Sequence, residues 1–247
     1  MEDFRKKGSP SHSGFCFEVC ADSLDAVAMA IAGGADRVEL CRELDTGGLT
    51  PDRDDIRRAV AMAREAGRPF AVNVLVRPRP GDFVYDEAEK RDMLNAVADI
   101  CRLGVDGVVI GALDSDGTVD PEWTRSAVAA AHDAGVSVTF HRAFDRVADF
   151  AASLETLVKI GVDRILTSGC LTCAADGTPT LAMLVSLTDG HPVIMPGGGV
   201  RSSNIRRIRE ATGAREFHSS CKVGVADAQV TELDEIRSIS KIMESFS

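Results

Sequence analysis

The sequence predicts a single-domain α/β protein with the (β/α)8 fold of a TIM barrel. Eight short runs of apolar and β-branched residues alternate strictly with eight amphipathic helical patterns along the 247 residues. A short segment that begins with Gly and ends with Asp precedes several of these runs, as in Gly33-Gly-Ala-Asp36, Gly104-Val-Asp106 and Gly161-Val-Asp163. A glycine there ends a helix in the left-handed conformation, and the chain turns directly into a strand. Strict alternation implies parallel strands, and eight such units usually close into a barrel of this size.

The spacing of apolar residues predicts the bounds of each strand and helix. The expected strands are residues 15–19, 36–41, 70–77, 106–110, 136–141, 163–168, 192–195 and 215–219. Helical periodicity separates them at residues 24–32, 53–65, 87–103, 122–134, 150–160, 181–188 and 204–211, and a last helix at 232–245 follows the eighth strand. Residues 1–14 carry early charges and then Gly, Ser and Pro, without an apolar signal-peptide core. We therefore expect a disordered or vector-derived tail at 1–14 and one TIM barrel domain over 15–247.

Composition excludes several classes of partner. The formal net charge is -10 and the pI is about 5.0, which argues against nucleic acid or an anionic membrane as the main partner. No apolar run approaches the ~20 residues of a membrane span. The seven cysteines stand mostly in apolar or strand contexts, unlike a disulfide framework. We expect a cytoplasmic protein; a homodimer through an apolar patch on the helix ring stays open.

Alternation inside the strands predicts where the chemistry lies. Successive strand residues face opposite sides, and one set is apolar, as at Val72, Val74 and Val76. The opposite set becomes polar toward the carboxyl ends; it comprises Cys16, Glu18, Cys20, Glu39, Cys41, Asn73, Arg77, Thr139, His141, Glu216, His218 and Ser220. Charged groups inside a barrel are costly unless they are paired or used. We therefore expect a functional pocket at the carboxyl-end mouth of the barrel.

Two segments are candidate anion sites. Arg77 and Arg79 lie on a proline-stiffened loop and can present planar forks to a carboxylate or phosphate. The alternative is that both arginines pair with neighbouring carboxylates and merely close the barrel. After the seventh strand, Gly197, Gly198 and Gly199 can bring backbone N–H groups to an anion beside Ser219 and Ser220. The alternative there is a tight turn that requires left-handed glycines.

The cysteines offer a metal site. Cys20 and Cys41 end the first two strands on the inward set, and neighbouring strands lie about 4.8 Å apart, so the two sulfurs can meet. Two thiolates suit Cu(I) or Zn. The alternative is that each is an ordinary buried cysteine. The pair Cys170 and Cys173 follows the sixth strand as a lone C-x-x-C, which is a weak signal for a metal or redox role.

The remaining inward polar groups fit acid–base chemistry. Glu18, Glu39, His141 and His218 can hold a divalent metal or act as general acid and base. The alternative is a satisfied ionic network with Arg77 and Arg142. Of the six lysines none lies inside an expected strand, so a Schiff-base aldolase is improbable.

At these residues the chain resembles the CutC family of copper homeostasis proteins. The matching segments are Phe17-Glu-Val-Cys20, Gly33-Gly-Ala-Asp-Arg-Val-Glu-Leu-Cys41, Gly47-Gly-Leu-Thr-Pro51, Arg77-Pro-Arg79, Gly81-Asp-Phe-Val-Tyr85, Thr139-Phe-His-Arg-Ala-Phe-Asp145, Leu166-Thr-Ser-Gly169, Pro196-Gly-Gly-Gly-Val200 and Glu216-Phe-His218. The resemblance implies a TIM barrel, a cytoplasmic role in copper handling, and Cu(I) ligation by Cys20 and Cys41. Pro80 replaces the usual glycine before the Gly81-to-Tyr85 segment, and Cys173 lies outside the family pattern.

Two functional hypotheses follow, and they leave open whether the protein is an enzyme. In the first, Cys20 and Cys41 bind Cu(I), with Glu18, Glu39 and His218 around them. In the second, a lyase or isomerase acts on a small phosphorylated or carboxylate substrate. Its catalytic groups come from Glu18, Glu39, Arg77, His141, Arg142, Asp145 and His218, and its anion site from Arg77, Arg79 and the Gly197–Gly199 turn. A purely structural barrel fits poorly with so many inward ionisable groups.

Overall fold

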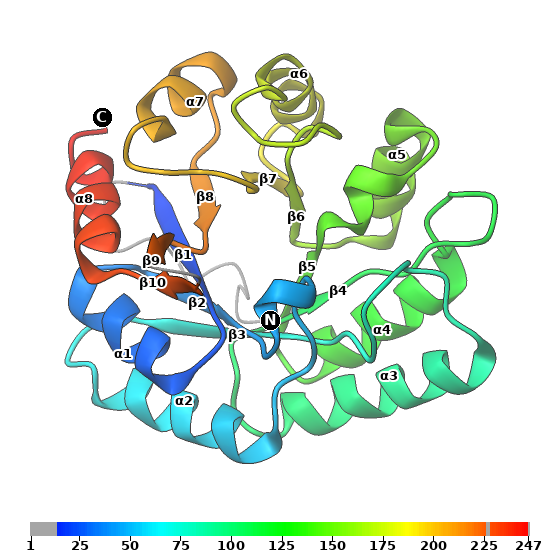
Figure 1. The fold of residues 1–247 in the computed structure, drawn as a ribbon. Helices are drawn as coiled ribbons and strands as arrows, with labels where there is room; N and C mark the ends of the chain where they lie inside the picture. The colour runs from blue at the N-terminus through cyan, green and yellow to red at the C-terminus, as the bar shows by residue number, and fades with distance from the viewer. Residues whose placement is uncertain (1–13, 226–227, 247) are drawn as a thin grey trace.

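The computed structural model describes residues 14–225 and 228–246, and it confirms the TIM barrel (Figure 1). Its parallel strands are β1 (Cys16–Ala21), β2 (Arg37–Leu40), β3 (Ala71–Leu75), β4 (Gly107–Ile110), β5 (Ser137–Phe140), β6 (Arg164–Thr167), β7 (Val193–Pro196) and β8 (Glu216–Ser219). The hydrogen-bonded order runs β7-β6-β5-β4-β3-β2-β1-β8, and β7 contacts β8, so the sheet curls round on itself. All eight predicted strands are present, with ends shifted by one or two residues.

Helices cover the outside of this sheet (Figure 1). They are α1 (Leu24–Gly33), α2 (Arg53–Glu65), α3 (Glu87–Cys101), α4 (Pro121–Asp133), α5 (Phe150–Ile160), α6 (Thr178–Thr188), α7 (Ile205–Thr212) and α8 (Leu233–Glu244). Side chains of Asp86, Asp120 and Asp149 accept hydrogen bonds from the first free backbone N–H groups of α3, α4 and α5. These N-caps explain why the helices begin there.

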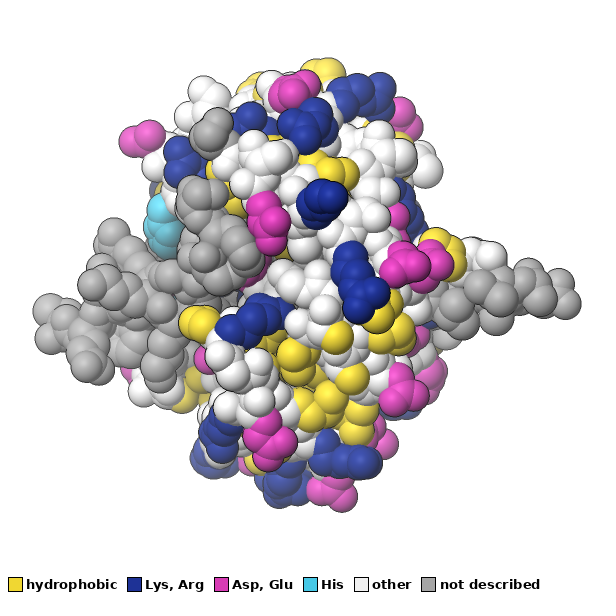
Figure 2. Space-filling model, turned by 90° about the vertical axis from the view of Figure 1, so that its left-hand side faces the viewer, with side chains coloured by type: hydrophobic (Ala, Val, Ile, Leu, Met, Phe, Trp, Pro, Cys, Tyr) yellow, Lys and Arg dark blue, Asp and Glu magenta, His cyan; other side chains and the backbone are white. Residues whose placement is uncertain are grey.

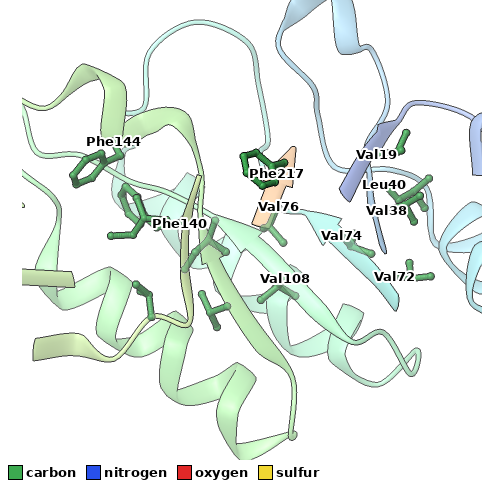
Figure 3. Packing of buried hydrophobic residues seen from close by; sticks show 14 of the residues in the cluster. Val19, Val38, Leu40, Val72, Val74, Val76, Val108, Phe140, Phe144 and Phe217 are labelled. Carbon is green, nitrogen blue, oxygen red and sulfur yellow. The ribbon is translucent and has the colours of Figure 1, made fainter. Parts of the chain in front are cut away.

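The outward strand residues form the main core. Val19, Val38 and Val72 are fully buried under the helices, together with Val74 and Val108 on the neighbouring strands (Figure 3). This is the apolar set that strand alternation predicted. Removing it from water accounts for much of the stability of a barrel, at roughly 25 cal/mol per Å² of apolar surface.

A salt-bridge network fills the amino-terminal part of the barrel interior. Arg37 of β2 is 1% exposed; its Nε donates to Glu18 Oε2 of β1 at 2.5 Å, and its Nη2 donates to Glu216 Oε2 of β8 at 2.6 Å. Arg164 of β6 donates to the same Glu216 oxygen at 2.8 Å. Burial alone would raise the pKa of Glu216, but the charges of Arg164 and Arg37 outweigh it and lower that pKa.

Several segments differ from the sequence prediction. Between β8 and α8 the chain forms an antiparallel hairpin of β9 (Lys222–Val225) and β10 (Ala228–Thr231), which was not predicted. A two-stranded hairpin carries little periodic signal, and this one is tied to the barrel by a 2.7 Å ion pair of Lys222 with Asp22. Two 3-10 helices, η2 (Leu44–Thr46) and η3 (Arg142–Arg146), were also missed. The predicted tail at 1–14 lies, apart from Gly14, outside the described residues.

The surface bears on the predicted partners. Among the described residues, no helix combines the length and apolar character needed to cross a membrane. On the face in Figure 2, hydrophobic side chains gather in the lower half, with Lys, Arg, Asp and Glu around them. The homodimer stays a prediction.

Replacing Arg37 with methionine should destabilise the barrel strongly. The change leaves Glu18 and Glu216 buried with one cationic partner fewer, and breaking a buried ion pair in this way costs about 3–5 kcal/mol. Urea unfolding followed by circular dichroism measures the effect. Arg57→Met is the matched control, because Arg57 pairs with Asp54 on an exposed helix surface, where such a pair contributes less than about 0.5 kcal/mol. Equal losses of unfolding free energy in Arg37→Met and Arg57→Met would contradict the proposed contribution of the buried network to stability.

Candidate functional site at the barrel mouth

Two adjacent cavities lie at the carboxyl ends of the strands. The inner one has a volume of about 340 Å³ and is lined by residues at or after the ends of β1, β2, β3, β5, β6, β7 and β8, among them Cys20, Glu39, His141 and His218. The outer one, of about 770 Å³, lies over the loops after β3, β4 and β5. Both are lined by Gly47, Arg77, Phe83 and Arg142, so they lie next to each other. The predicted mouth pocket is therefore present.

The two predicted thiols lie in contact, and Cys20 lines the inner cavity. Cys20 Sγ and Cys41 Sγ lie 3.9 Å apart, and both residues are buried. Leu75, Val109 and the partly buried Leu44 pack against them and form an apolar cover. The hydrogen bond between the thiols, together with burial, raises the pKa of Cys20 well above its ordinary value. Without a metal the Cys20 thiol is therefore protonated and poorly reactive.

The carboxyl group of Glu39, on β2, lies beside the Cys20 thiol. Cys20 Sγ donates to Glu39 Oε1 at 3.6 Å, while Glu39 Oε2 is buried and has no hydrogen-bond partner among the described residues. Burial raises the pKa of Glu39, and this exceeds the opposing attraction of the charge on His218. A carboxyl of this kind suits proton exchange or metal ligation, as predicted.

His218 is oriented by a fully buried carboxylate. Its Nδ1 lies 2.7 Å from Glu18 Oε1, and the other oxygen of Glu18 accepts from Arg37 Nε and from Asn73 Nδ2 at 3.2 Å. Burial opposes ionisation of Glu18, but Arg37 and His218 outweigh it and lower the pKa of Glu18 to about 2. Burial likewise lowers the pKa of His218, but the bond to Glu18 and the charge of Glu39 reverse this and raise it.

This arrangement leaves the Nε2 atom of His218 available to the cavity. One ligand atom from each of Cys20, Glu39 and His218 lies within 4.8 Å of the other two, and all three residues are buried. A carboxylate bound to the far nitrogen of a histidine is the usual second partner of a metal-binding imidazole. The described chain therefore brings Cys20, Glu39 and His218 together with metal-ligand chemistry, while Cys41, the other predicted ligand, contacts this group through the sulfur of Cys20.

His141 has the opposite tautomer. Its Nδ1 accepts a hydrogen bond from the backbone N–H of Ala143 at 3.1 Å, so in the neutral ring the hydrogen is on Nε2. Burial, and then the charge of Arg77, lower the pKa of His141 from 6.5 to about 3. Its Nε2 is buried, has no partner among the described residues, and belongs to a ring that lines the inner cavity. His141 is thus a hydrogen-bond donor at neutral pH.

Arg77 holds the loops around the mouth. Its Nη atoms donate to the backbone carbonyls of Gly48 at 3.1 Å and Gly81 at 2.9 Å, and its guanidinium lies over the ring of Phe83. Neither the predicted carboxylate partner Glu18 nor Glu39 contacts it. Its buried Nε has no acceptor at hydrogen-bond distance in the described chain. Arg79 instead points away from both cavities and pairs with Glu89 at 2.6 Å and Asp82 at 3.1 Å.

Arg142 and Asp145 join η3 to the end of β6. Arg142 Nε donates to Asp145 Oδ2 at 2.7 Å, and its Nη2 donates to Ser168 Oγ at 3.1 Å. Asp145 also accepts from the hydroxyl of Thr167 at 2.5 Å and from the backbone N–H of Ser168. Asp145 lines only the outer cavity, whereas Arg142 lines both. The carboxylate is therefore fully engaged in holding Arg142.

The glycine turn after β7 lies beside Arg142. Gly198 and Gly199 have φ values of +92° and +73° and line the inner cavity with Ser219 and Ser220. Gly197 does not; its N–H donates to the carbonyl of Thr167. Cys173 packs near Gly199, and its thiol donates to Asp176 at 3.1 Å, while Cys170 Sγ donates to the carbonyl of Phe144. Both cysteines are separately engaged.

Sequence reasoning missed some residues of the site. Arg37 shares the inward side of β2 with Glu39, so strand alternation carried a signal for it. Leu44 and Phe83 lie on loops, where no periodicity indicates which side chains turn toward the cavity.

Comparisons with known proteins match this chain to one family. The model of the CutC family matches residues 15–223. A CutC family protein of Parabacteroides distasonis is 46% identical over 206 residues, covering 83% of this chain and 82% of the relative. A human "copper homeostasis protein cutC homolog" is 43% identical over 211 residues, covering 85% of this chain and 74% of the relative. A solved CutC structure from Streptococcus agalactiae has a TM-score of 0.78 at 32% identity, covering 83% of this chain and 98% of that one.

The two histidines should differ in nuclear magnetic resonance spectra. Long-range ¹H–¹⁵N correlations should show the Nε2–H tautomer for His141, without titration between pH 8 and pH 5, because its pKa lies near 3. Because the pKa is lowered, the His141 ring stays neutral as the pH falls, until the pH approaches about 3. An exposed histidine such as His191 serves as the reference. A midpoint near 6.5 for His141, or a hydrogen on its Nδ1, would contradict the assignment.

Proposed function

Because this chain belongs to the CutC family of copper homeostasis proteins, we propose that it binds Cu(I) between Cys20, Cys41 and His218. The observation that carries the proposal is the 3.9 Å approach of two buried thiols, of which Cys20 Sγ lies within 4.8 Å of a nitrogen of His218. Thiolates are the soft ligands that Cu(I) prefers. We place this activity in the cytoplasm, where thiols stay reduced.

The spacing of the sulfurs supports three ligands. Metal–thiolate bonds of about 2.3 Å, the value for zinc, let two sulfurs lie up to about 4.6 Å apart across one ion. The distance of 3.9 Å between Cys20 and Cys41 is shorter and suits a bent arrangement that leaves room for a third ligand. His218 is suited to this role because Glu18 engages its Nδ1 and leaves Nε2 for the metal.

Glu39 has a separate role in the proposal. Binding a metal to protonated thiols releases their protons, and Glu39 Oε1 already accepts from Cys20 Sγ. Glu39 therefore takes up the thiol proton when Cu(I) enters. A carboxylate oxygen is a hard ligand, which favours Zn²⁺ over Cu(I) at the cluster of Cys20, Glu39 and His218.

Removing the thiols should abolish tight Cu(I) binding. Anaerobic titration against a competing Cu(I) chelator should give one ion per wild-type chain and an affinity at least about 100-fold lower for Cys20→Ala/Cys41→Ala. Cys101→Ala is the matched control, because Cys101 is a buried thiol on α3, away from the mouth. Equal stoichiometry and affinity in the wild type and the double variant would refute the site.

Replacing Glu39 with glutamine should lower the affinity for Zn²⁺ much more than the affinity for Cu(I). We expect Cu(I) affinity to change less than about threefold, while Zn²⁺ affinity falls about tenfold or more, since only zinc uses the carboxylate. Glutamine keeps the volume and one carbonyl oxygen, so the cavity shape is preserved. Competition titrations with each metal give the ratio. A tenfold loss of Cu(I) affinity alone would show that Glu39 ligates copper.

A further inference from the structure

We propose that the inner cavity also binds a small organic anion, a phosphate or a carboxylate. Its charged end lies between Arg142 and the Gly198–Gly199 turn, and a carbonyl or hydroxyl oxygen of the same molecule accepts a hydrogen bond from His141. The proposal does not depend on copper, because none of these groups is a proposed Cu(I) ligand.

The cavity wall contains buried donors that the protein does not use. His141 is 5% exposed, and its Nε2–H has no partner among the described residues. Arg77, also 5% exposed, interacts with the side chain of Tyr85, and its buried Nε–H has no acceptor at hydrogen-bond distance among the described residues. Both residues line the inner cavity. A buried donor without an acceptor costs about 1–3 kcal/mol, so a ligand that supplies acceptor oxygens is favoured there.

The turn after β7 and Arg142 provide the position for the charge. A Cβ atom on Gly198 would lie 3.1–3.3 Å from the guanidinium atoms of Arg142, so that group sits directly against the turn. Asp145 and Ser168 engage Nε and Nη2 of Arg142, which leaves Nη1. Within residues 14–225, the backbone N–H groups of Gly198 and Gly199 have no hydrogen-bond acceptor. Successive N–H groups of this kind bind anions.

The volume and the charged groups of the inner cavity favour an organic anion as its ligand. Its 340 Å³ falls in the range of roughly 300–1,000 Å³ typical of small-molecule pockets, and a single metal ion needs far less. Leu44, Phe83 and Leu166 provide apolar wall for a carbon skeleton. In the outer cavity three aspartates, Asp82, Asp114 and Asp145, offset the three arginines that line it, so it has no excess of positive charge to attract an anion. The guanidinium groups of Arg77 and Arg142 attract one in a chain whose net charge is -10.

Isothermal titration of metal-free protein tests the site with three probes: glycerol 3-phosphate, lactate and neutral glycerol. We expect one or both anions to bind with one site per chain, and glycerol not to bind. Arg142→Gln should weaken binding about tenfold or more, the effect of one charge-assisted hydrogen bond. Arg146→Gln is the matched control: it removes an exposed arginine of the same η3 segment that lines only the outer cavity, and it should leave the affinity unchanged.

His141→Phe supplies a second, independent readout. It should weaken glycerol 3-phosphate but leave inorganic phosphate unaffected, because phosphate alone does not reach His141. Failure of both anions to bind at millimolar concentration would overturn the proposal, as would equal losses in Arg142→Gln and Arg146→Gln. The copper titration is run without these anions, so either proposal can fail while the other stands.

Discussion

The buried carboxylate of Glu18 is the constraint on which the rest of the site depends. It is 0% exposed, and an isolated carboxylate at such depth is too costly to remain charged. It is kept ionised by Arg37 of β2, Asn73 of β3 and His218 of β8. These partners meet only when four neighbouring strands hold their observed register, so the same interaction fixes the barrel and aims His218 at the cavity.

The mouth is divided into two chemically different halves. Around β1, β2 and β8 lie soft or lone-pair ligands, namely the two thiols and the free nitrogen of His218. Around β3, β5 and β7 lie hydrogen-bond donors, namely Arg77, His141 and the glycine turn. The two histidines also differ, because Glu18 engages Nδ1 of His218, whereas Nδ1 of His141 accepts from a backbone N–H and leaves its hydrogen on Nε2. The mouth can therefore hold a soft cation and an organic anion side by side.

Strand alternation predicted the fold and most of the inward residues, because a period of two assigns every strand side chain to one face. It could not predict which groups each inward side chain would bond to. Arg77 is inward as expected, yet its guanidinium bonds to loop carbonyls, which depends on how the segments around Gly48 and Gly81 fold back. Arg79 is turned outward by Glu89, a residue of the following helix. Long side chains on loops carry no periodic signal, and the β9–β10 hairpin was missed for the same reason.

The central proposal is that Cys20, Cys41 and His218 share one Cu(I) ion. X-ray absorption spectroscopy at the copper edge of the Cu(I)-loaded protein tests it most directly. The account predicts a first coordination shell of two sulfur atoms and one nitrogen from an imidazole, and the nitrogen should disappear in His218→Gln. A shell that contains only nitrogen and oxygen would contradict it.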